Sequence, residues 1–372
     1  MKNLILTFQF ANNYGAILQA HALSSYIKNE LHEDCEIIQY WPKRSDASWK
    51  LYYRGWDIKT ILRNIYVFFD FKLKKEYSQK NKIMARAISE LLPLTQKKYT
   101  TEEIHKNPPI ADAYICGSDQ VWNFVKCFDD PTYFFDFTKD MKGVRRIGYA
   151  PSIADPWPES RWDEFRKYLS NMDYISVREK SDVEVVEKLS GKKVTHVIDP
   201  VFLQSKEYWS NLAVEPQIKF PYIFCYFLGT NDLAVELVNK VREVTGCKVV
   251  HLNLNARDRF NSDYDLRAVS SQEFIGFIKN AAYVCTNSFH CSAFSIIFQR
   301  NYCVAPKGFA NARMESLQEM FGLGQRMFKH EAIADLDKER LAIDYSHAAD
   351  RFAPFEKESK EFLSNALYGE RD

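Results

Sequence analysis

Neither sign of charge predominates in this chain of 372 residues, which carries 50 Lys and Arg against 49 Asp and Glu. A general nucleic-acid binder needs a basic face that displaces counterions from phosphates, so the balance argues against a nucleic-acid partner. Glycine and proline number only 13 each, which is too few for a disordered chain. With 46% hydrophobic residues, the composition predicts a globular protein, and the length favours two domains.

Long apolar runs are also absent. The two richest stretches, residues 61–73 and 289–298, are short or interrupted by charge, whereas a membrane-spanning helix needs about 20 apolar residues. The apolar start of the chain turns polar at Gln9 and is too short for a secretory signal. The sequence therefore predicts a cytoplasmic protein without a membrane span.

The eight cysteines form no Cys-x-x-Cys pair, and no histidine stands at zinc-site spacing. Most lie inside apolar runs, which favours buried thiols in a reducing compartment, and no metal site is predicted. The chain also has no Gly-x-Ser-x-Gly elbow, no Gly-x-Gly-x-x-Gly and no Walker-type loop. These absences exclude the enzyme classes that depend on those motifs.

Short apolar runs alternate with segments of helical periodicity, a pattern typical of parallel strands joined by crossover helices. Strands are predicted at residues 4–8, 35–40, 112–116, 146–150, 174–177, 194–198, 221–228, 248–252, 281–285 and 302–305. Helices are predicted at about 16–31, after Pro158, and at 179–189, 232–245, 271–280, 288–298 and 355–367. We expect an α/β protein with two Rossmann-like, doubly wound domains facing across a cleft.

The first domain is predicted to cover residues 1–205, with an aromatic and basic helical excursion at about 41–100. The second is predicted to cover 216–345. A C-terminal helix lies within 346–372, and packing back on the first domain is one arrangement open to it. Ligands of open parallel sheets bind beyond the carboxyl ends of the strands, so the functional residues should follow strands.

Asn13-Tyr14-Gly15 separates the first strand from its helix, where freed N–H groups and a glycine suit an anion. On spacing alone, an ordinary turn is the better interpretation. Arg178 directly follows the strand at 174–177, and its guanidinium is suited to bind a phosphate or a carboxylate. Pairing with the adjacent Glu179 is an equal alternative.

The segment 117–123, Gly-Ser-Asp-Gln-Val-Trp-Asn, follows the third strand of the first domain. A Ser or Asp helix cap accounts for one of its polar residues. Gln120, Trp122 and Asn123 have no such structural reason, and together they favour a sugar site with an aromatic face and polar partners for hydroxyl groups.

His290 stands in the first turn of the predicted helix at 288–298, which Ser288 can cap. A core histidine is the usual interpretation, but the position after a strand favours contact with an anion and proton exchange. Adjacent helical residues do not face one another, so no dyad of Cys291 with His290 is expected.

Taken together, these loops resemble the polysaccharide pyruvyl transferase family. The resemblance covers most of the chain and rests on the order and spacing of the motifs at 13–20, 117–123, 149–152, 176–179, 198–200 and 287–290, followed by Asn311, Arg313, Gly322, Leu323 and Arg326. Two positions depart from the family pattern: Cys291 stands where Gly is common, and Asn287 where Asp is common.

The resemblance implies a two-domain fold similar to that of GT-B glycosyltransferases. It also implies transfer of pyruvate from phosphoenolpyruvate to two sugar hydroxyls as a cyclic ketal, with release of phosphate and no further cofactor. The expected acceptor is a growing glycan of the kind used in bacterial cell-surface polysaccharides and exopolysaccharides, in some members carried on a membrane lipid.

Residue roles follow from this resemblance. His290 is predicted to protonate the donor or its leaving phosphate, Asp119 to take the proton of the acceptor hydroxyl, and Arg178 to stabilise the donor's charge. The expected donor-binding residues are Asn13, Tyr14, Gly15, Arg178, Ser288, Phe289, His290 and Arg313. The expected acceptor-binding residues are Ser118, Asp119, Gln120, Trp122, Asn123 and Ser152.

The excursion has the composition of an interfacial helix, because aromatic and aliphatic residues from Trp49 to Phe71 are interleaved with lysine and arginine. One interpretation is peripheral contact with the inner membrane surface. The other, which is favoured, is that helices pack over the first domain with a basic outer face.

Two other functions stay open. A glycosyltransferase using a nucleotide sugar would suit the same architecture, because a fold does not fix its chemistry. A non-catalytic glycan-binding protein would keep the cleft without turnover.

Overall fold

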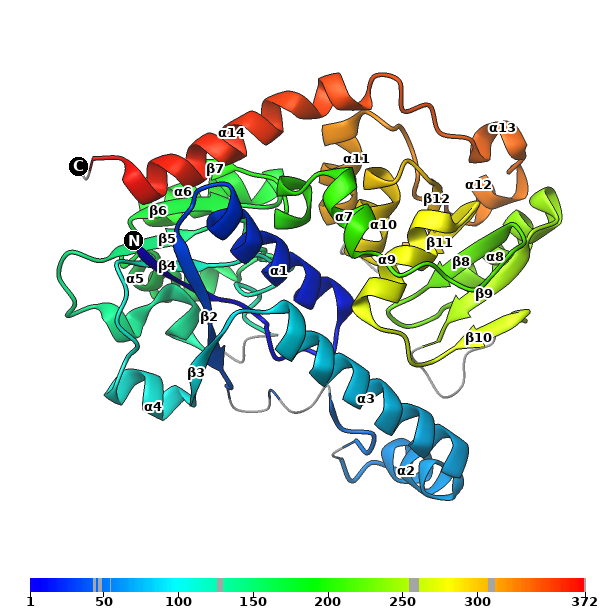
Figure 1. Cartoon of the computed structure of the whole chain (residues 1–372), viewed down its shortest axis with the longest axis horizontal. Coiled ribbons are helices and arrows are strands. Elements are labelled where there is room, and N and C mark those ends of the chain that lie inside the picture. Colours follow the sequence, from blue (N-terminus) through cyan, green and yellow to red (C-terminus); the bar gives the residue numbers. More distant parts are fainter. Residues whose placement is uncertain are drawn as a thin grey trace.

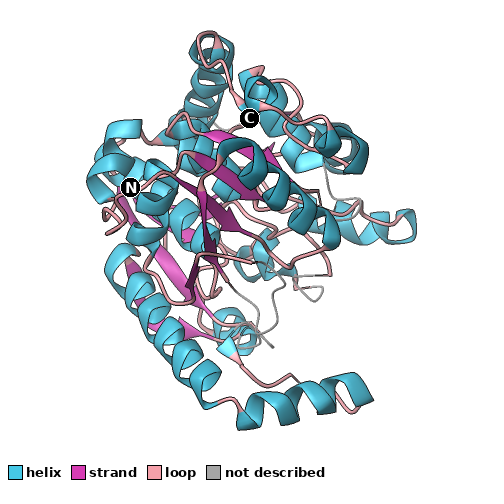
Figure 2. Cartoon of the chain, turned by 90° about the vertical axis from the view of Figure 1, so that its right-hand side faces the viewer, coloured by secondary structure: helices cyan, strands magenta, loops and turns pink. Residues whose placement is uncertain are grey.

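The computed structural model describes residues 1–42, 45, 49–53, 55–125, 130–253, 261–306 and 312–370. Strands lie in its interior and helices cover them from outside (Figures 1 and 2). The described strands form a sheet of seven and a sheet of five, and every strand pairing is parallel. We call each sheet with its helices a lobe.

The first sheet has the order β3-β2-β1-β4-β5-β6-β7. Its strands are β1 (Lys2–Leu6), β2 (Asp34–Tyr40), β3 (Leu94–Tyr99), β4 (Ala113–Cys116), β5 (Arg145–Gly148), β6 (Tyr174–Val177) and β7 (Val194–His196). Its helices are α1 (Tyr14–Asn29), α2 (Ile58–Phe69), α3 (Phe71–Leu91), α4 (Thr101–Lys106), α5 (Trp162–Leu169) and α6 (Val183–Ser190). The strand order reverses between β1 and β4, so the loops after these two strands diverge and leave room for a ligand.

The second sheet has the order β10-β9-β8-β11-β12 and reverses between β8 and β11. Its strands are β8 (Tyr222–Tyr226), β9 (Lys248–Leu252), β10 (Tyr264–Leu266), β11 (Tyr283–Thr286) and β12 (Asn301–Val304). The remaining helices are α7 (Lys206–Leu212), α8 (Asp232–Thr245), α9 (Ser271–Asn280), α10 (Phe289–Ile297), α11 (Ala312–Phe321), α12 (His330–Ala334), α13 (Lys338–Leu341) and α14 (Ala348–Tyr368).

Several predicted elements have the observed bounds, including β6, α8, β9 and α9. The capping box of Ser270 and Glu273 is present at the start of α9. Two strands were missed: β3, which lies inside the supposed excursion and pairs with β2, and the short β10. Both have largely exposed or polar residues, so neither shows the apolar run of a central strand. The last helix begins at Ala348, earlier than predicted, and includes Pro354.

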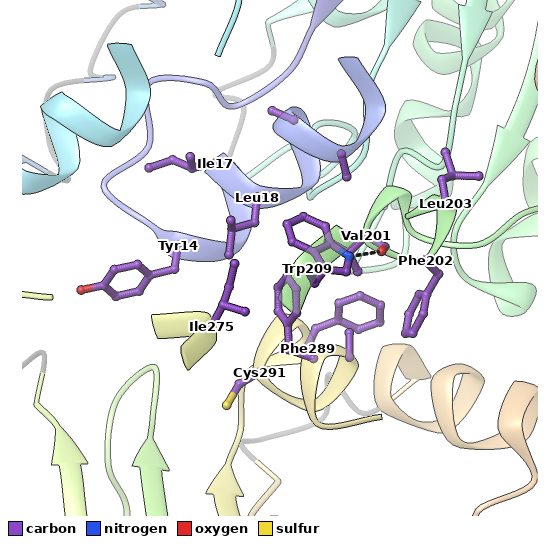
Figure 3. Close-up of a cluster of buried hydrophobic side chains, with 14 of the residues drawn as sticks. Tyr14, Ile17, Leu18, Val201, Phe202, Leu203, Trp209, Ile275, Phe289 and Cys291 are labelled. Atoms are coloured by element: carbon purple, nitrogen blue, oxygen red, sulfur yellow. Dashed lines mark hydrogen bonds between the residues drawn. The ribbon is translucent and has the colours of Figure 1, made fainter. Parts of the chain in front are cut away.

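The lobes share one apolar core. The ring of Tyr14, at the start of α1, stacks on Phe274 of α9 with centroids 4.7 Å apart, and the Tyr14 hydroxyl donates to the Val269 carbonyl at 3.1 Å. Trp209 meets Phe294 of α10 at 4.9 Å. Figure 3 shows Leu18 of α1 on the side of the helix that faces Trp209 and Ile275. This packing brings the β1–α1 loop to the start of α10.

Helix α14 returns from the second lobe across the first (Figure 1). Phe352 stacks on Phe321 of α11 at 4.3 Å, and Ser359 Oγ accepts a hydrogen bond from the Ile198 amide at 2.9 Å. Arg145 of β5 donates to the Ala366 carbonyl at 3.2 Å. No helix in the described part of the chain is long and apolar enough to cross a bilayer.

Candidate functional site

A buried carboxylate, Asp199, connects the loops that follow three strands of the first sheet. Its Oδ2 atom accepts hydrogen bonds from Ser118 Oγ at 3.0 Å and from an Arg178 guanidinium nitrogen at 2.9 Å. The same oxygen lies 3.4 Å from His290 Nε2 in the second lobe. Burial alone would raise the pKa of Asp199, but His290 and Arg178 hold it well below its usual range.

Arg178 already has partners inside the protein. Its Nε donates to Glu179 Oε1 at 2.9 Å, and its guanidinium carbon lies 4.3 Å from the centre of the Phe289 ring. Burial disfavours the charge, but the carboxylates of Glu179 and Asp199 raise the pKa of Arg178 above its ordinary value. The structure therefore contains the predicted alternative, a pair with Glu179, and places that pair at the junction of the lobes.

The imidazole ring of His290 occupies the space that a side chain at residue 15 would fill, so this position requires glycine. A Cβ atom at Gly15 would lie 2.1 Å from His290 Nδ1, far inside contact distance. His290 Nε2, in contrast, is buried without a hydrogen-bond partner among the described residues. This nitrogen and the nearby Asp199 carboxylate could serve a proton transfer in which the imidazolium is stabilised by the neighbouring negative charge.

Arg313, in the first turn of α11, is a second arginine at the junction; the residue is half-buried, and its Nε atom is buried. Burial and the positive charge of Arg178 lower its pKa, whereas Glu179, Asp119 and Asp155 act in the opposite direction. Its Nε has no hydrogen-bond partner in the part of the chain that the structure describes. Because an unpaired buried donor is costly, Arg313 is suited to receive an anion.

Ser288 is the N-cap of α10, as the sequence predicts. Ser288 caps it by accepting from the Cys291 amide at 3.4 Å, and Phe289 lies under Arg178. Cys291 points into the core, and burial raises its pKa to about 12, so it is not a thiolate nucleophile. Asn287 accepts from the Leu228 amide at 2.7 Å and donates to the Gly229 carbonyl at 3.1 Å, which ties the loop after β8 to this helix start.

Two residues expected to contact the donor have structural roles. Asn13 caps α1 and accepts from the Gly15 amide at 2.8 Å and the Ala16 amide at 3.3 Å. Tyr14 is enclosed between the lobes, with its hydroxyl bonded to a carbonyl. The burial of Tyr14 removes its side chain from a ligand. Asn13 is half-buried, and its contact with the donor stays a prediction.

Trp122 does not offer a face to a sugar. It is 1% exposed and stacks on Phe134 with centroids 4.9 Å apart. A Cβ atom at Gly148 would lie 3.2 Å from its ring, so that glycine gives the indole its space. The density of polar residues around Trp122 suggested a sugar platform, whereas burial in the aromatic core of the first lobe explains the ring.

The other residues of the 117–123 segment lie around the junction. Asp119 has the positive φ of 79°, and its Oδ1 accepts from the Gln120 amide at 2.8 Å. Asn123 donates to Asp155 at 2.9 Å. Ser152 is buried, and its Oγ has no hydrogen-bond partner among the described residues. Gln120 is half-buried.

Asp199 and Glu179 were not predicted as site residues. Glu179 comes shortly after β6, and Asp199 shortly after β7. Ligands of parallel sheets bind beyond the carboxyl ends of the strands, so an acidic residue at such a position could have been predicted as a site residue. Asn311 and Cys127 lie outside the described residues. Within the described ranges, no three His, Cys, Asp or Glu side chains gather as a metal site.

The two parallel sheets and the polar junction at their carboxyl ends define a two-domain α/β protein of the GT-B type. Similar solved structures include MnaA of S. aureus with UDP, at 11% identity, 100% coverage of this chain and 99% of that chain, with a TM-score of 0.56. The UDP-N-acetylglucosamine 2-epimerase of Rickettsia bellii has 11% identity, coverages of 99% and 96%, and a TM-score of 0.54. At such identity the likeness shows the fold alone.

A third similar structure is the Methanocaldococcus jannaschii UDP-GlcNAc 2-epimerase in complex with UDP-GlcNAc and UDP, at 12% identity, coverages of 99% and 100%, and a TM-score of 0.53. No curated protein sequence matches the chain. The family model for polysaccharide pyruvyl transferase matches residues 13–301, and the chain belongs to this family.

Proposed function

We propose that the protein transfers the pyruvyl group of phosphoenolpyruvate to two neighbouring hydroxyls of a glycan, forming a cyclic ketal and releasing phosphate. Membership of the family supports pyruvyl transfer in general. The observation that carries the choice of donor is Arg313, whose Nε is buried without a hydrogen-bond partner among the described residues and whose charge interacts with that of Arg178. A small anion with a phosphate and a carboxylate would accept hydrogen bonds from the guanidinium of Arg313.

The two arginines have different proposed roles. Arg178 is held by Asp199 and Glu179, so its charge is already neutralised inside the protein, and its proposed role is to keep the Asp199 carboxylate in place. Arg313 has hydrogen-bonding capacity to spare and contacts the donor directly. The N–H groups at the start of α10, after Ser288, complete the anion site.

The proposed reaction begins when His290 gives a proton to the methylene carbon of phosphoenolpyruvate. Asp199 stabilises the positive charge that develops on the central carbon. Asp119 takes the proton of the first sugar hydroxyl while the oxygen of that hydroxyl bonds to the central carbon. The bond from that carbon to the phosphate oxygen then breaks. A second hydroxyl closes the ring, and its proton leaves with the phosphate. Transfer of the Asp119 proton to His290 restores both groups.

We propose that the acceptor contacts Asp119 and Gln120, which are half-buried. Ser118, Asn123 and Ser152 are buried beneath them and support the site without contacting the sugar. The proposed acceptor is a glycan, free or attached to a membrane lipid, destined for a cell-surface polysaccharide. Because phosphoenolpyruvate is a cytoplasmic metabolite, we place the reaction in the cytoplasm.

The second candidate is an enzyme that acts on a nucleotide sugar, favoured by the UDP and UDP-GlcNAc found in similar folds. Phosphorus NMR separates the candidates. Phosphoenolpyruvate is incubated with the protein and galactose-, glucose- or mannosamine-type acceptors, and UDP sugars are tested in parallel. Acceptor-dependent release of inorganic phosphate supports pyruvyl transfer, whereas release of UDP with phosphoenolpyruvate left intact supports the alternative.

A further inference from the structure

Helix α2 is amphipathic, but its apolar face points to solvent rather than to a core. Its apolar residues Ile58, Leu62, Ile65 and Phe69 recur at helical spacing along one face, and all four are exposed. Within α2, whose residues are all described, Val67 alone is buried. A helix of a globular protein turns its apolar stripe inward; α2 turns its stripe outward.

Helix α2 lies at the lower edge of the molecule in Figure 1, away from both sheets, and its apolar face is part of a larger exposed patch. Of 18 large hydrophobic side chains exposed in the described residues, 11 fall within residues 52–71. Trp56 is 95% exposed and, with Ile61, Ile65 and Phe68, helps line a pocket of 690 Å³. Such a concentration of exposed apolar surface marks an interaction site rather than ordinary scatter.

The charges around the patch indicate the partner. Residues 57–75 contain five basic side chains, Lys59, Arg63, Lys72, Lys74 and Lys75, and two acidic ones. Both acids are helix caps: Asp57 accepts from the Thr60 amide at 2.9 Å, and Asp70 from the Leu73 amide at 2.8 Å. An apolar stripe beside surplus cations complements acyl chains under anionic headgroups. A second copy of the same patch would instead bring like charges together.

We propose that residues 52–53 and 55–75, which we call the docking arm, bind the surface of an anionic phospholipid bilayer. Helix α2 lies in the plane of the interface, with Ile58, Leu62, Ile65 and Phe69 among the acyl chains. The lysines around it contact the headgroups. For α2 this proposal departs from the interpretation that the sequence favoured, in which the helices cover the first domain. Helix α3 does pack on that domain, through the buried Met84, Ala87 and Ile88.

The docking arm is connected to the functional site through hydrogen bonds at its base. Trp49 Nε1 donates to the Phe10 carbonyl at 2.6 Å, and Asn81 of α3 donates to the Trp49 carbonyl at 3.0 Å. Asn12 donates to Asn81 Oδ1 at 2.7 Å. Phe10 and Asn12 belong to the loop that leads to Gly15 and His290, so contact with a bilayer sets the position of the site relative to the lipid surface.

Vesicle sedimentation tests this proposal with the full-length protein. Wild-type protein is expected to pellet with vesicles that contain phosphatidylglycerol, and the Leu62→Ser/Phe69→Ser variant to bind more than about tenfold more weakly. The matched control, Ile110→Ser/Val214→Ser, alters two exposed apolar residues outside the docking arm and should bind like wild type. Equal pelleting of all three proteins, or no pelleting of the wild type, would overturn the proposal.

The charge contribution is tested with Lys59→Gln and Lys75→Gln, each of which should weaken binding about fivefold. If the wild type is instead a dimer that Leu62→Ser/Phe69→Ser dissociates, and vesicles leave it unbound, the patch joins two copies and the bilayer proposal is wrong. Vesicle binding requires no substrate, so its failure leaves the proposed transfer reaction untouched. Phosphate release with a water-soluble acceptor should be unchanged in these variants.

Discussion

Asp199 Oδ2, just after the last strand of the first sheet, lies 3.4 Å from His290 Nε2, in the first turn of α10 in the second lobe. One carboxylate thus contacts the proposed acid of one lobe and Arg178 of the other. A change at Asp199 should therefore disturb both catalysis and the junction of the lobes.

Replacement of Asp199 by Asn is expected to destabilise the fold by about 3–5 kcal/mol, because it removes one partner of a buried ion pair. The free energy of unfolding in urea measures this loss. Ser118→Ala, which removes a neutral hydrogen bond to the same oxygen, should cost only about 1 kcal/mol. Equal stability of Asp199→Asn and wild type would show that the contacts of Asp199 with Arg178 and His290 do not stabilise the fold.

His290→Ala is expected to lower turnover by about 10² to 10⁴. Gly15→Ala should also lower turnover, because its methyl group would occupy the place of the imidazole ring. Steady-state rates of both single variants and the double variant form a cycle. If Gly15 acts through His290, Gly15→Ala adds almost nothing in the His290→Ala background; independent, multiplying losses would contradict that connection.

Arg313→Gln is expected to raise the KM for phosphoenolpyruvate about tenfold to a hundredfold, because a charge-assisted hydrogen bond to the donor is lost. Arg313→Lys keeps the charge without the Nε donor and should fall between Gln and wild type. Titration of KM for donor and acceptor separately checks the assignment. A rise confined to the acceptor KM would move Arg313 to the acceptor side.

Trp122→Ala is expected to cost about 3–5 kcal/mol of folding free energy, since a large aromatic side chain leaves the core of the first lobe. Trp122→Phe should lose much less, because stacking on Phe134 can persist. Urea unfolding and acceptor KM are measured on the same samples. A raised acceptor KM at unchanged stability would restore the sugar-platform interpretation.

Asp182 gives the fold a pH dependence. Burial and the nearby Glu179 carboxylate raise its pKa to about 7. Between the ordinary Asp pKa of about 4 and this value, the folded chain keeps a proton that the unfolded chain has lost, so the contribution of Asp182 to stability falls as pH rises. Asp182→Asn should lose less Tm than wild type between about pH 5 and about pH 8. Parallel losses in both proteins would contradict this role.

The sequence predicted the fold well because buried parallel strands and amphipathic helices leave strong local patterns, as in β9 and α8. It missed β3 because an edge strand with the sequence LTQKKY lacks the apolar run of a central strand. The order of the loops along the sheets placed Arg178 and His290 correctly at strand ends. Whether the two side chains meet depends on how the lobes pack, which no local pattern encodes.

Roles of individual side chains were harder to predict than their positions. Trp122, Tyr14 and Asn13 stand among functional residues, but stacking, interlobe packing and helix capping explain them. The sequence cannot separate these uses, because the same residue types serve both. Asp199 was overlooked for the opposite reason: its importance comes from three partners that are 21 to 91 positions away in the chain.

The most direct test of the account uses phosphoenolpyruvate isotopically labelled at its central carbon, incubated with the wild-type protein and a glycan acceptor. Carbon NMR and mass spectrometry of the purified glycan should show the label in a quaternary ketal carbon joined to two sugar oxygens, with one phosphate released for each label incorporated. A glycan without label, while phosphoenolpyruvate is left intact or is hydrolysed to free pyruvate, would contradict pyruvyl transfer at the junction of Arg313, Asp199 and His290.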